Sequence, residues 1–539
     1  MRLLVDVDDV SKVIKTRGAI VKRTLSLSKA SPEESPEEAS EKPPENLPEN
    51  TPPATPEDER NGDPLEGKTT YLTRRKAIAL AALAGSGLGL SVGLSLLWKW
   101  RSSVTSSDSA PALEPDDAAN PSGVQEDGPI KVGLLHSLSG SMAISEAVLV
   151  DAEVLAIEEI NANGGILGRQ IVPVIEDGAS DSPTFAERAE NLIEQAEVAV
   201  IFGGGTSASR KAVIPVVEAN DHMLWYLLPY EGQECSKNVF YVGATPNQNI
   251  EPAVDWLLEN KGENKGENKG ENEDENKGKS FFLVGDNKLF SQTLSTLVQT
   301  QLSEKAGSLA GQATIDSAIA LGTAEITALT DSIQQAMPEG GVIFNSLSGE
   351  SNLAFFRQLA SAGLEPEKYP VMSVRLAEEE VRQIGPEYLA GHYATWSYFQ
   401  TIQRPENEKW VAAFKAKYGQ DRVLGAPMES AYTAVHLWAQ AVEDAGTTKT
   451  EAVREKVYGQ SFDAPEGLMT MQPSHHMAKT VRIGQVQADG LFKIVLETEM
   501  PVEPSPWNQS LPQTAGYFCD WSDEARGGKY KADEPPQFD

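Results

Sequence analysis

The sequence IKVGLLHSLSG, residues 130–140, indicates how the chain folds. It opens with a short apolar run and ends in a polar turn, which is typical of a buried strand followed by a loop. Apolar residues at helical spacing follow between Ala152 and Ile160, and an Asn-Gly-Gly sequence at 163–165 ends the helix that they predict. A strand, a turn and an amphipathic helix in this order form the repeating unit of α/β proteins.

The same alternation continues along the chain. Further apolar runs that predict strands lie at 171–175, 198–202, 281–284, 341–344 and 371–374, each preceding a helical stretch. Strands that alternate with helices predict parallel sheets covered on both faces. One doubly wound sheet rarely needs about 380 residues, so we expect two α/β lobes between residues 129 and 505.

The segments before this domain differ sharply in composition. We predict disorder for residues 1–70, because the part from 31 to 66 holds nine prolines and twelve acids against two basic residues. Residues 77–98 contain neither charge nor proline. A helix of that length reaches roughly 33 Å, enough to cross a bilayer core of about 30 Å. A transmembrane signal anchor is therefore predicted, with a buried soluble helix as the alternative, and residues 102–128 are predicted to be a linker.

Two later segments interrupt or extend the domain. Residues 259–279 include Lys-Gly-Glu-Asn three times and no apolar residue, which predicts a solvated insertion. Residues 506–539 form a C-terminal tail that is expected to pack on a lobe or on another chain. Cys235 and Cys519 are the only cysteines. They could form one bridge outside the reducing cytosol, but the sequence leaves their pairing open.

The charge and the motifs exclude several function classes. The 46 basic and 79 acidic residues give a net charge of −33, which argues against a general nucleic-acid binder. Signatures of serine hydrolases, zinc proteases and phosphate loops are absent from the sequence. The adjacent His475 and His476 lack a third metal ligand nearby in sequence. Residues 378–380, three consecutive glutamates, are predicted to be a solvated helix start. We therefore expect no catalytic residue, no metal and no cofactor.

One loop has the composition of a ligand site. Gly203-Gly204-Gly205-Thr206-Ser207 follows a predicted strand and opens a helix. Such a loop directs backbone N–H groups, hydroxyls and the positive end of the helix dipole toward the carboxyl edge of the sheet. It would suit a carbonyl or carboxylate oxygen, although a plain glycine turn is the alternative. The turn that contains Ser139 occupies the equivalent place after the first strand.

Several segments resemble a known family over residues 130–502. They are LSGSMAISE (138–146), AIEEIN (156–161), EDGASD (176–181), TSASRKAV (206–213), GHYA (391–394), FDAPEG (462–467) and KTVRIGQ (479–485). With them the chain resembles the extracytoplasmic solute-binding proteins of ABC transporters, in particular the urea and short-chain-amide binders of the branched-chain-amino-acid type. The resemblance implies two Rossmann-like lobes of a type I periplasmic binding protein, which close around a ligand in the cleft.

The resemblance also implies a set of ligand contacts. They are Ser139, Gly205, Thr206, Ser207, Tyr226, Tyr230 and Glu231 of the first lobe, and Asp286, Asn287, Ser346 and Glu350 of the second. The chain departs from the family pattern at or beside several of these contacts, at residues 205, 226–228, 286–288 and 348–350. Gly205 replaces an aromatic residue, which predicts a larger pocket, and Lys288 adds a charge at the cleft edge. The ligand is therefore left open among urea, an amide and an amino acid.

The function implied is that of a substrate-binding subunit of an ABC importer. It would be tethered to the cell membrane through residues 77–98, keep its binding domain outside the cytoplasm and deliver its solute to permease subunits. The alternative is a ligand-sensing receptor of the amide-responsive type, without transport. Residues 1–70 show no kinase, cyclase or DNA-binding pattern, which favours transport.

Overall fold

The computed structural model describes residues 128–261, 280–305, 307–315, 324–522 and 528–531. These belong to a compact unit that spans Ala118–Asp539. The predicted disordered segment 1–70, the predicted span 77–98, nearly all of the 102–128 linker and most of the insertion lie outside the described residues. No helix in the described ranges is long and apolar enough to cross a membrane.

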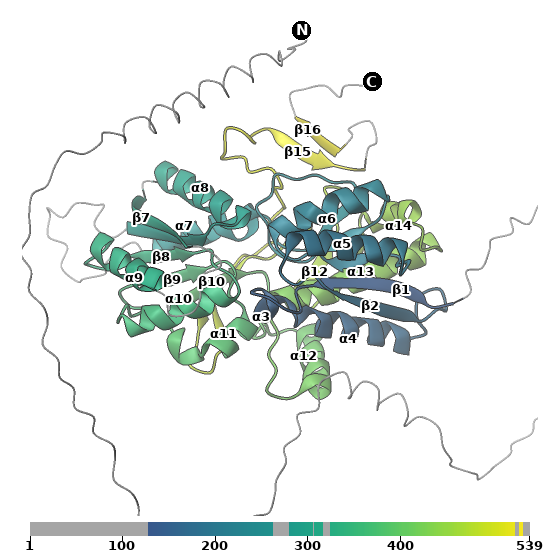
Figure 1. Ribbon diagram of the computed structural model, residues 1–539, viewed down its shortest axis with the longest axis horizontal. Helices are drawn as coiled ribbons and strands as arrows, with labels where there is room; N and C mark the ends of the chain where they lie inside the picture. Colours follow the sequence, from purple (N-terminus) through teal and green to yellow (C-terminus); the bar gives the residue numbers. More distant parts are fainter. Residues whose placement is uncertain (1–127, 262–279, 306, 316–323, 523–527, 532–539) are drawn as a thin grey trace, which may run out of the picture. The chain divides into compact units, whose positions relative to one another are not determined.

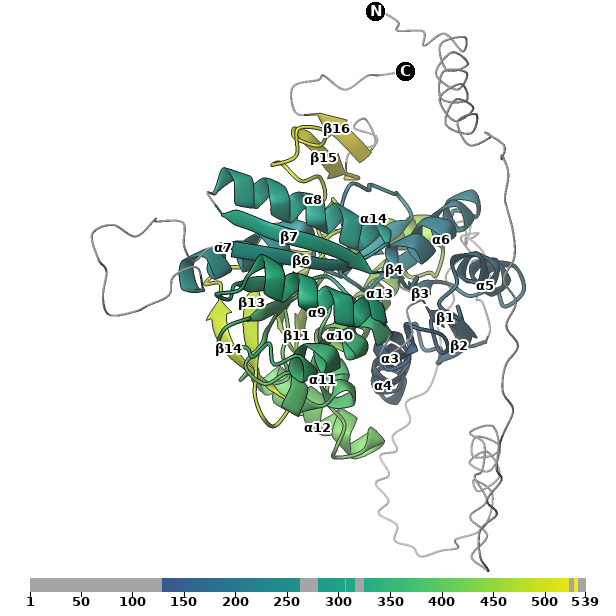
Figure 2. The same ribbon diagram turned by 60° about the vertical axis from the view of Figure 1, so that its left-hand side comes forward.

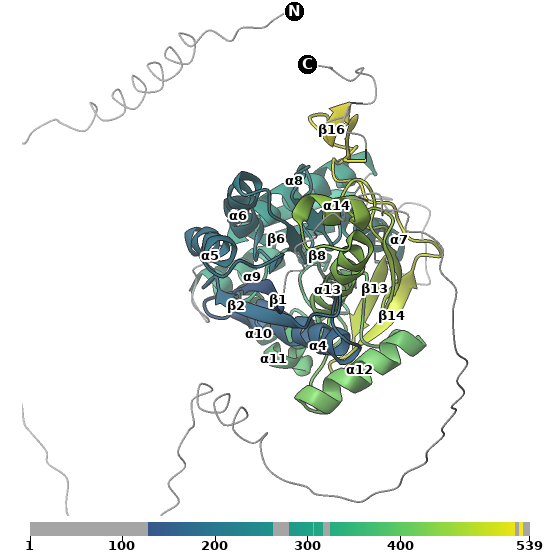
Figure 3. The same cartoon turned by 90° about the vertical axis from the view of Figure 1, so that its right-hand side faces the viewer.

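The first lobe is built on a five-stranded parallel sheet in the order β2-β1-β3-β4-β5 (Figures 1 and 2). Its strands are β1 (Ile130–His136), β2 (Ile171–Asp177), β3 (Ile201–Gly203), β4 (Leu224–Tyr226) and β5 (Val239–Tyr241). Its helices are α3 (Ala143–Glu146), α4 (Leu149–Ala162), α5 (Ser182–Glu194), α6 (Ser207–Ala219), α12 (Pro405–Tyr418), α13 (Ala426–Ala445) and α14 (Thr450–Val457). The pair α5 and α6 covers one face, and α4 with α13 covers the other (Figure 3).

The second lobe contains a seven-stranded sheet in the order β14-β13-β10-β9-β8-β6-β7 (Figures 1 and 2). The parallel strands are β6 (Ser280–Asp286), β7 (Ser308–Ile315), β8 (Val342–Asn345), β9 (Val371–Ser373) and β10 (Tyr393–Trp396), and the antiparallel ones are β13 (Arg482–Val486) and β14 (Phe492–Glu497). Its helices are α7 (Ile250–Asn260), α8 (Leu289–Glu304), α9 (Ala324–Ala336), α10 (Glu350–Ser361) and α11 (Glu378–Ile384). The parallel α/β architecture predicted from the sequence is thus confirmed, while the antiparallel edge was not predicted.

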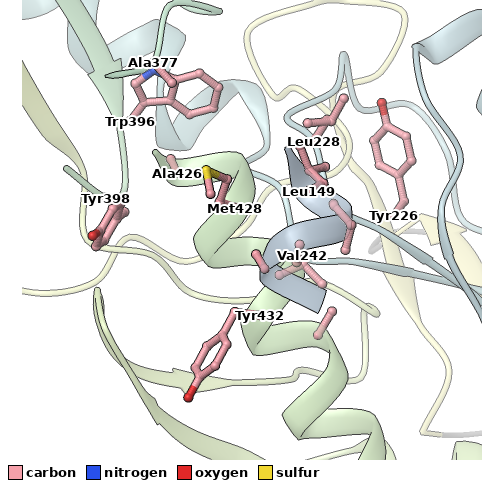
Figure 4. Close-up of a cluster of buried hydrophobic side chains, with 14 of the residues drawn as sticks. Leu149, Tyr226, Leu228, Val242, Ala377, Trp396, Tyr398, Ala426, Met428 and Tyr432 are labelled. Atoms are coloured by element: carbon pink, nitrogen blue, oxygen red, sulfur yellow. The ribbon is translucent and has the colours of Figure 1, made fainter. Parts of the chain in front are cut away.

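Three connectors link the lobes, at residues 242–249, 397–404 and 471–481. Gln248 lies in the first one and donates from its side-chain amide to the carbonyl oxygens of Met477 and Val502, both at 2.8 Å. The first and third connectors therefore lie side by side. Buried side chains around them, among them Leu149, Tyr226, Trp396 and Met428, join the two lobes in one hydrophobic cluster (Figure 4).

The C-terminal tail packs on the domain. Asn508 donates to Glu251 at 2.6 Å, and the backbone N–H of Gln233 donates to the carbonyl of Pro506 at 2.6 Å. Strands β15 (Tyr517–Asp520) and β16 (Gly528–Lys531) form a hairpin. A disulfide joins Cys519 of β15 to Cys235, with 5.8 Å between their Cα atoms. The structure thus answers the pairing question that the sequence left open, and it places the tail on its own chain.

Candidate ligand-binding site

A small cavity lies between the lobes, at the carboxyl ends of strands in both sheets. It is lined by Thr206, Ser207 and Ala208 from the first lobe and by Asp286, Lys288, Leu289, Phe290, Ser291, Ser346, Ser348 and Arg375 from the second. Its volume is about 20 Å³, room for a water-sized group. The lobes therefore meet closely around this space, which has to widen before it can admit a molecule larger than water.

The first wall of the cavity is the N-terminus of α6. The hydroxyl oxygen of Thr206 accepts the backbone N–H of Ser209 at 3.3 Å, so this residue caps the helix. The N-terminal end of this helix carries the positive end of its dipole. Residues 203–205 hold positive φ angles of 124°, 97° and 61°, which explains the three glycines before the cap.

Gly205 does not enlarge the cavity as the sequence suggested. A Cβ atom placed on Gly205 would lie 2.5 Å from the ring of Phe185, which is fully buried. The missing side chain therefore lets Phe185 pack against the loop. The expectation of a larger pocket at this position is corrected, because a side chain from α5 occupies the space.

Behind α6 lies a buried network centred on Arg210. Its guanidinium donates to Glu231 and to Glu234, both at 2.9 Å, and lies over the rings of Tyr226 and Tyr230, 4.6 and 4.7 Å from their centroids. Burial alone would raise the pKa of Glu234, but the cations of Arg210 and the neighbouring lysine lower that pKa to about 2. Glu234 therefore stays ionised. This network fixes the helix N-terminus from behind.

Ser207 connects that network to the cavity. Its hydroxyl donates to Glu231 at 2.5 Å, while the residue also lines the cavity wall. Glu231 is thus held by both Ser207 and Arg210. The orientation of the first wall is therefore set by charge-assisted hydrogen bonds rather than by the loop alone.

The second lobe contributes an ion pair and hydroxyls. Asp286 accepts a hydrogen bond from Ser291 at 2.6 Å, and Lys288 lies 3.1 Å from the same carboxylate. Ser346 donates to the carbonyl of Val284 at 3.2 Å. The ammonium of Lys288 also lies 3.8 Å from the sulfur of Met142 in the first lobe. Lys288 therefore faces the opposite lobe.

Arg375 is a cavity residue that the sequence reasoning missed. It follows β9, donates to the carbonyl of Pro229 in the first lobe at 2.7 Å and lies 4.1 Å from the ring centroid of Phe290. Only 8% of it is exposed. The sequence indicated a possible site residue here only by its position directly after the predicted strand 371–374. The contact between Arg375 and Pro229 of the other lobe cannot be predicted from the sequence.

The structure brings together some of the predicted site residues. Thr206, Ser207, Asp286 and Ser346 line the cavity, and Gly205, Tyr226, Tyr230 and Glu231 belong to the layer that supports α6. The remaining three are not part of the cavity lining. Ser139 donates to Asp177 at 2.7 Å in an exposed turn, and Asn287 and Glu350 are exposed.

Residues 378–380 contradict the prediction of a solvated helix start. They do open α11, but Glu378, Glu379 and Glu380 are 0%, 5% and 4% exposed. Helix α11 packs against α3 of the first lobe, and Glu378 accepts the backbone N–H of Gln400 in a connector at 2.7 Å. Burial raises the pKa of Glu378 to about 8 and that of Glu380 to about 7. These carboxyl groups are buried by elements that are distant in sequence.

The two adjacent histidines are structural. His476 accepts or donates a hydrogen bond with the hydroxyl of Tyr230 at 2.6 Å, and His475 contacts the hydroxyl of Tyr458 at 2.9 Å. Burial lowers the pKa of His475 to about 3 and of His476 to about 4, so both are neutral. Across the described part of the chain, no three potential metal-binding side chains come together.

A family model described as periplasmic binding protein domain matches residues 130–513. A leucine-, isoleucine-, valine-, threonine- and alanine-binding protein of Pseudomonas aeruginosa is 25% identical over 343 residues, which cover 63% of this chain and 84% of that protein. Limonene hydroxylase of Geobacillus stearothermophilus is 36% identical over 123 residues, 23% of each chain. Leu/Ile/Val-binding protein homolog 7 of Brucella abortus is 37% identical over 89 residues, 16% of this chain and 22% of that protein. The matched segments thus span less than a quarter of the length of these last two relatives.

Solved structures share the fold. The branched-chain amino acid transporter substrate binding protein of Streptococcus pneumoniae, in complex with isoleucine, has a TM-score of 0.58 at 20% identity, covering 70% of this chain and 100% of that chain. A solute binding protein of an ABC transporter from Rhodopseudomonas palustris, in complex with 4-hydroxybenzoate, has a TM-score of 0.60 at 19% identity, covering 70% and 98%. At these identities the comparison establishes the architecture alone.

Proposed function

The chain belongs to the periplasmic binding protein family, and on that premise we propose that it is the substrate-binding subunit of an ABC-type importer for a small polar solute. Members of this family bind solutes and are not enzymes. The observation that carries the proposal is the small cavity between the lobes, with the N-terminus of α6 on one side and hydroxyl and charged side chains on the other.

The proposed ligand is a small molecule with a carbonyl group, either urea, a short-chain amide or a small amino acid. A carbonyl or carboxylate oxygen matches the N–H groups at the start of α6. The hydroxyls of Ser346 and Ser348 can serve as donors or acceptors for the rest of the solute. One similar protein is named as an amino-acid-binding protein and another was solved in complex with 4-hydroxybenzoate, which supports a small organic solute of this kind.

We further propose that the binding domain lies outside the cytoplasm. The disulfide between Cys235 and Cys519 supports this location, because disulfides persist in oxidising compartments. The apolar segment 77–98 is the proposed membrane tether, and permease subunits of the importer are the proposed recipients of the solute.

Calorimetric titration of the purified chain with urea, formamide, acetamide and leucine tests the proposal. We expect one of them to bind with micromolar affinity or better. Ser346→Ala removes a cavity hydroxyl and should weaken that affinity about threefold to tenfold. The matched variant Ser361→Ala, on the exposed end of α10, should leave it unchanged. The proposal is contradicted if none of the four solutes releases heat or raises the melting temperature at millimolar concentration.

A further inference from the structure

We infer that the solute bound between the lobes at this cavity carries a carboxylate and that Arg375 is the residue that pairs with it. This inference rests on the proposed function, because it names the chemical class of the ligand that the proposed site takes.

Arg375 is a buried cation without an ion-pair partner among the described residues. It is 92% buried, since 8% is exposed, and its Nε finds no hydrogen-bond partner in the described ranges. Its two clear contacts are the uncharged carbonyl of Pro229 and the ring of Phe290. A buried charge is costly unless an opposite charge lies against it.

The other charges around the cavity are already paired. Lys288 is paired with Asp286 at 3.1 Å, and the two cations of Arg210 and Lys211 are paired with the two carboxylates of Glu231 and Glu234 at 2.9 Å. Because these charges neutralise one another, the charge of Arg375 gives the cavity lining one net positive charge.

Glu146 is a carboxyl group of the first lobe that interacts electrostatically with Arg375. It lies beyond ion-pair distance of Arg375 and accepts the backbone N–H of Ser137 at 2.8 Å instead. Burial raises its pKa, with the hydrogen bond from Ser137 and the charges of His136 and Arg375 acting in the opposite direction. The negative charge of Glu146 is thus disfavoured by burial, and this group is a poor counter-ion for Arg375.

The opposite wall favours the same ligand chemistry. Helix α6 has 13 residues and begins at Ser207, which lines the cavity, so the positive end of its dipole lies at that wall. A carboxylate between α6 and Arg375 would neutralise the unpaired cation and accept hydrogen bonds from both lobes. A neutral amide or urea would leave the charge of Arg375 unpaired.

Pairs of solutes that match in shape and differ in charge provide the test. The full chain is titrated with acetate and acetamide and with propionate and propionamide. We expect each carboxylate to bind at least tenfold more tightly than its amide. Arg375→Gln should abolish this preference by weakening carboxylate binding, while amide binding changes less than threefold. Arg375→Lys keeps the charge and should retain part of the preference.

Arg357→Gln is the matched control. Arg357 is an exposed residue of α10 that donates to the carbonyl of Ile384 at 3.1 Å and lies outside the cavity lining. It should keep the wild-type preference. Tighter binding of the amides, or a carboxylate preference that survives in Arg375→Gln, overturns the inference and leaves the proposed function intact. Failure of these four solutes to bind, together with failure of urea, formamide and leucine, contradicts the proposed function itself. The comparison within the wild-type protein holds even if Arg375→Gln does not fold.

Discussion

At the scale of single residues, the buried glutamates at the start of α11 are a source of pH sensitivity. Glu378 is completely buried, and one carboxylate oxygen accepts the backbone N–H of Gln400, while the other lacks a hydrogen-bond partner in the described part of the chain. Burial disfavours the charged form of a carboxyl group and so raises its pKa. A group with this environment stabilises the fold mainly while it is protonated.

Replacing Glu378 should therefore change how stability depends on pH. The pKa of Glu378 is about 8 in the folded chain against an ordinary value of 4.5. Because the folded value is the higher one, its contribution is fully present below about pH 4.5 and is lost as the pH rises toward 8. We expect wild-type stability to fall relative to Glu378→Gln over that window, by up to roughly 5 kcal/mol. Denaturant unfolding at pH 5, 7 and 9 measures the difference.

Glu387→Gln serves as the control for this prediction, because Glu387 is an exposed glutamate close to α11. It should follow the wild-type pH profile. If Glu378→Gln also follows that profile, Glu378 does not titrate in this range and the reading of its environment is wrong.

At the scale of helices and strands, local patterns predicted most of the fold. The run at 130–135 became β1, and the strand expected at 281–284 lies inside β6. The strand expected at 198–202 begins only at Ile201, although Val198 and Val200 are also buried. An apolar run indicates that its residues are buried, and burial alone does not distinguish a strand from the loop that leads into it.

Contacts between distant segments explain what the sequence could not predict. Glu378 is buried by a connector and by α3, more than 230 residues earlier in the chain. Arg375 donates a hydrogen bond to the carbonyl of Pro229 in the other lobe, and the ring of Phe185 in the preceding helix packs against Gly205. The candidate site was therefore predictable where a loop follows its own strand, as at Thr206, Ser207, Asp286 and Ser346. It was not predictable where a second element supplies the neighbour.

The hairpin of β15 and β16 should depend on its disulfide. Cys519 in β15 is bonded to Cys235, 284 residues earlier, so the bond restricts a long loop in the unfolded chain. The double variant Cys235→Ser, Cys519→Ser should lower the free energy of unfolding by about 2–4 kcal/mol. It should also expose the hairpin to limited proteolysis while leaving solute affinity unchanged, since neither cysteine lines the cavity.

A neighbouring exposed side chain provides the control for that experiment. Ser522→Ala changes a residue that follows β15 and should leave stability and proteolysis as in the wild type. Equal stability of the double cysteine variant and the wild type, measured under oxidising conditions, would show that the tail is held by its other contacts.

At the scale of the whole domain, contacts between the lobes lie next to the cavity. Ser348 of the second lobe lies 3.7 Å from the sulfur of Met142 in the first, and the backbone N–H of Glu350 donates to the carbonyl of Ser141 at 3.2 Å. Arg375 adds its hydrogen bond to Pro229. Since these contacts surround the proposed ligand, capture of the solute and approach of the lobes should be one coupled process.

Ser348→Phe tests this coupling by placing a bulky side chain between the lobes. Ser348 is half-buried and both lines the cavity and contacts Met142, so the ring should keep the lobes apart without entering the core of either one. We expect solute affinity to fall at least about tenfold, because the binding-competent state becomes less populated. Solute binding should also lower the radius of gyration of this variant less than that of the wild type, as measured by small-angle X-ray scattering. Ser361→Phe, at an exposed site on α10, should bind and contract like the wild type. Wild-type affinity and contraction in Ser348→Phe would mean that the solute binds without bringing these surfaces together.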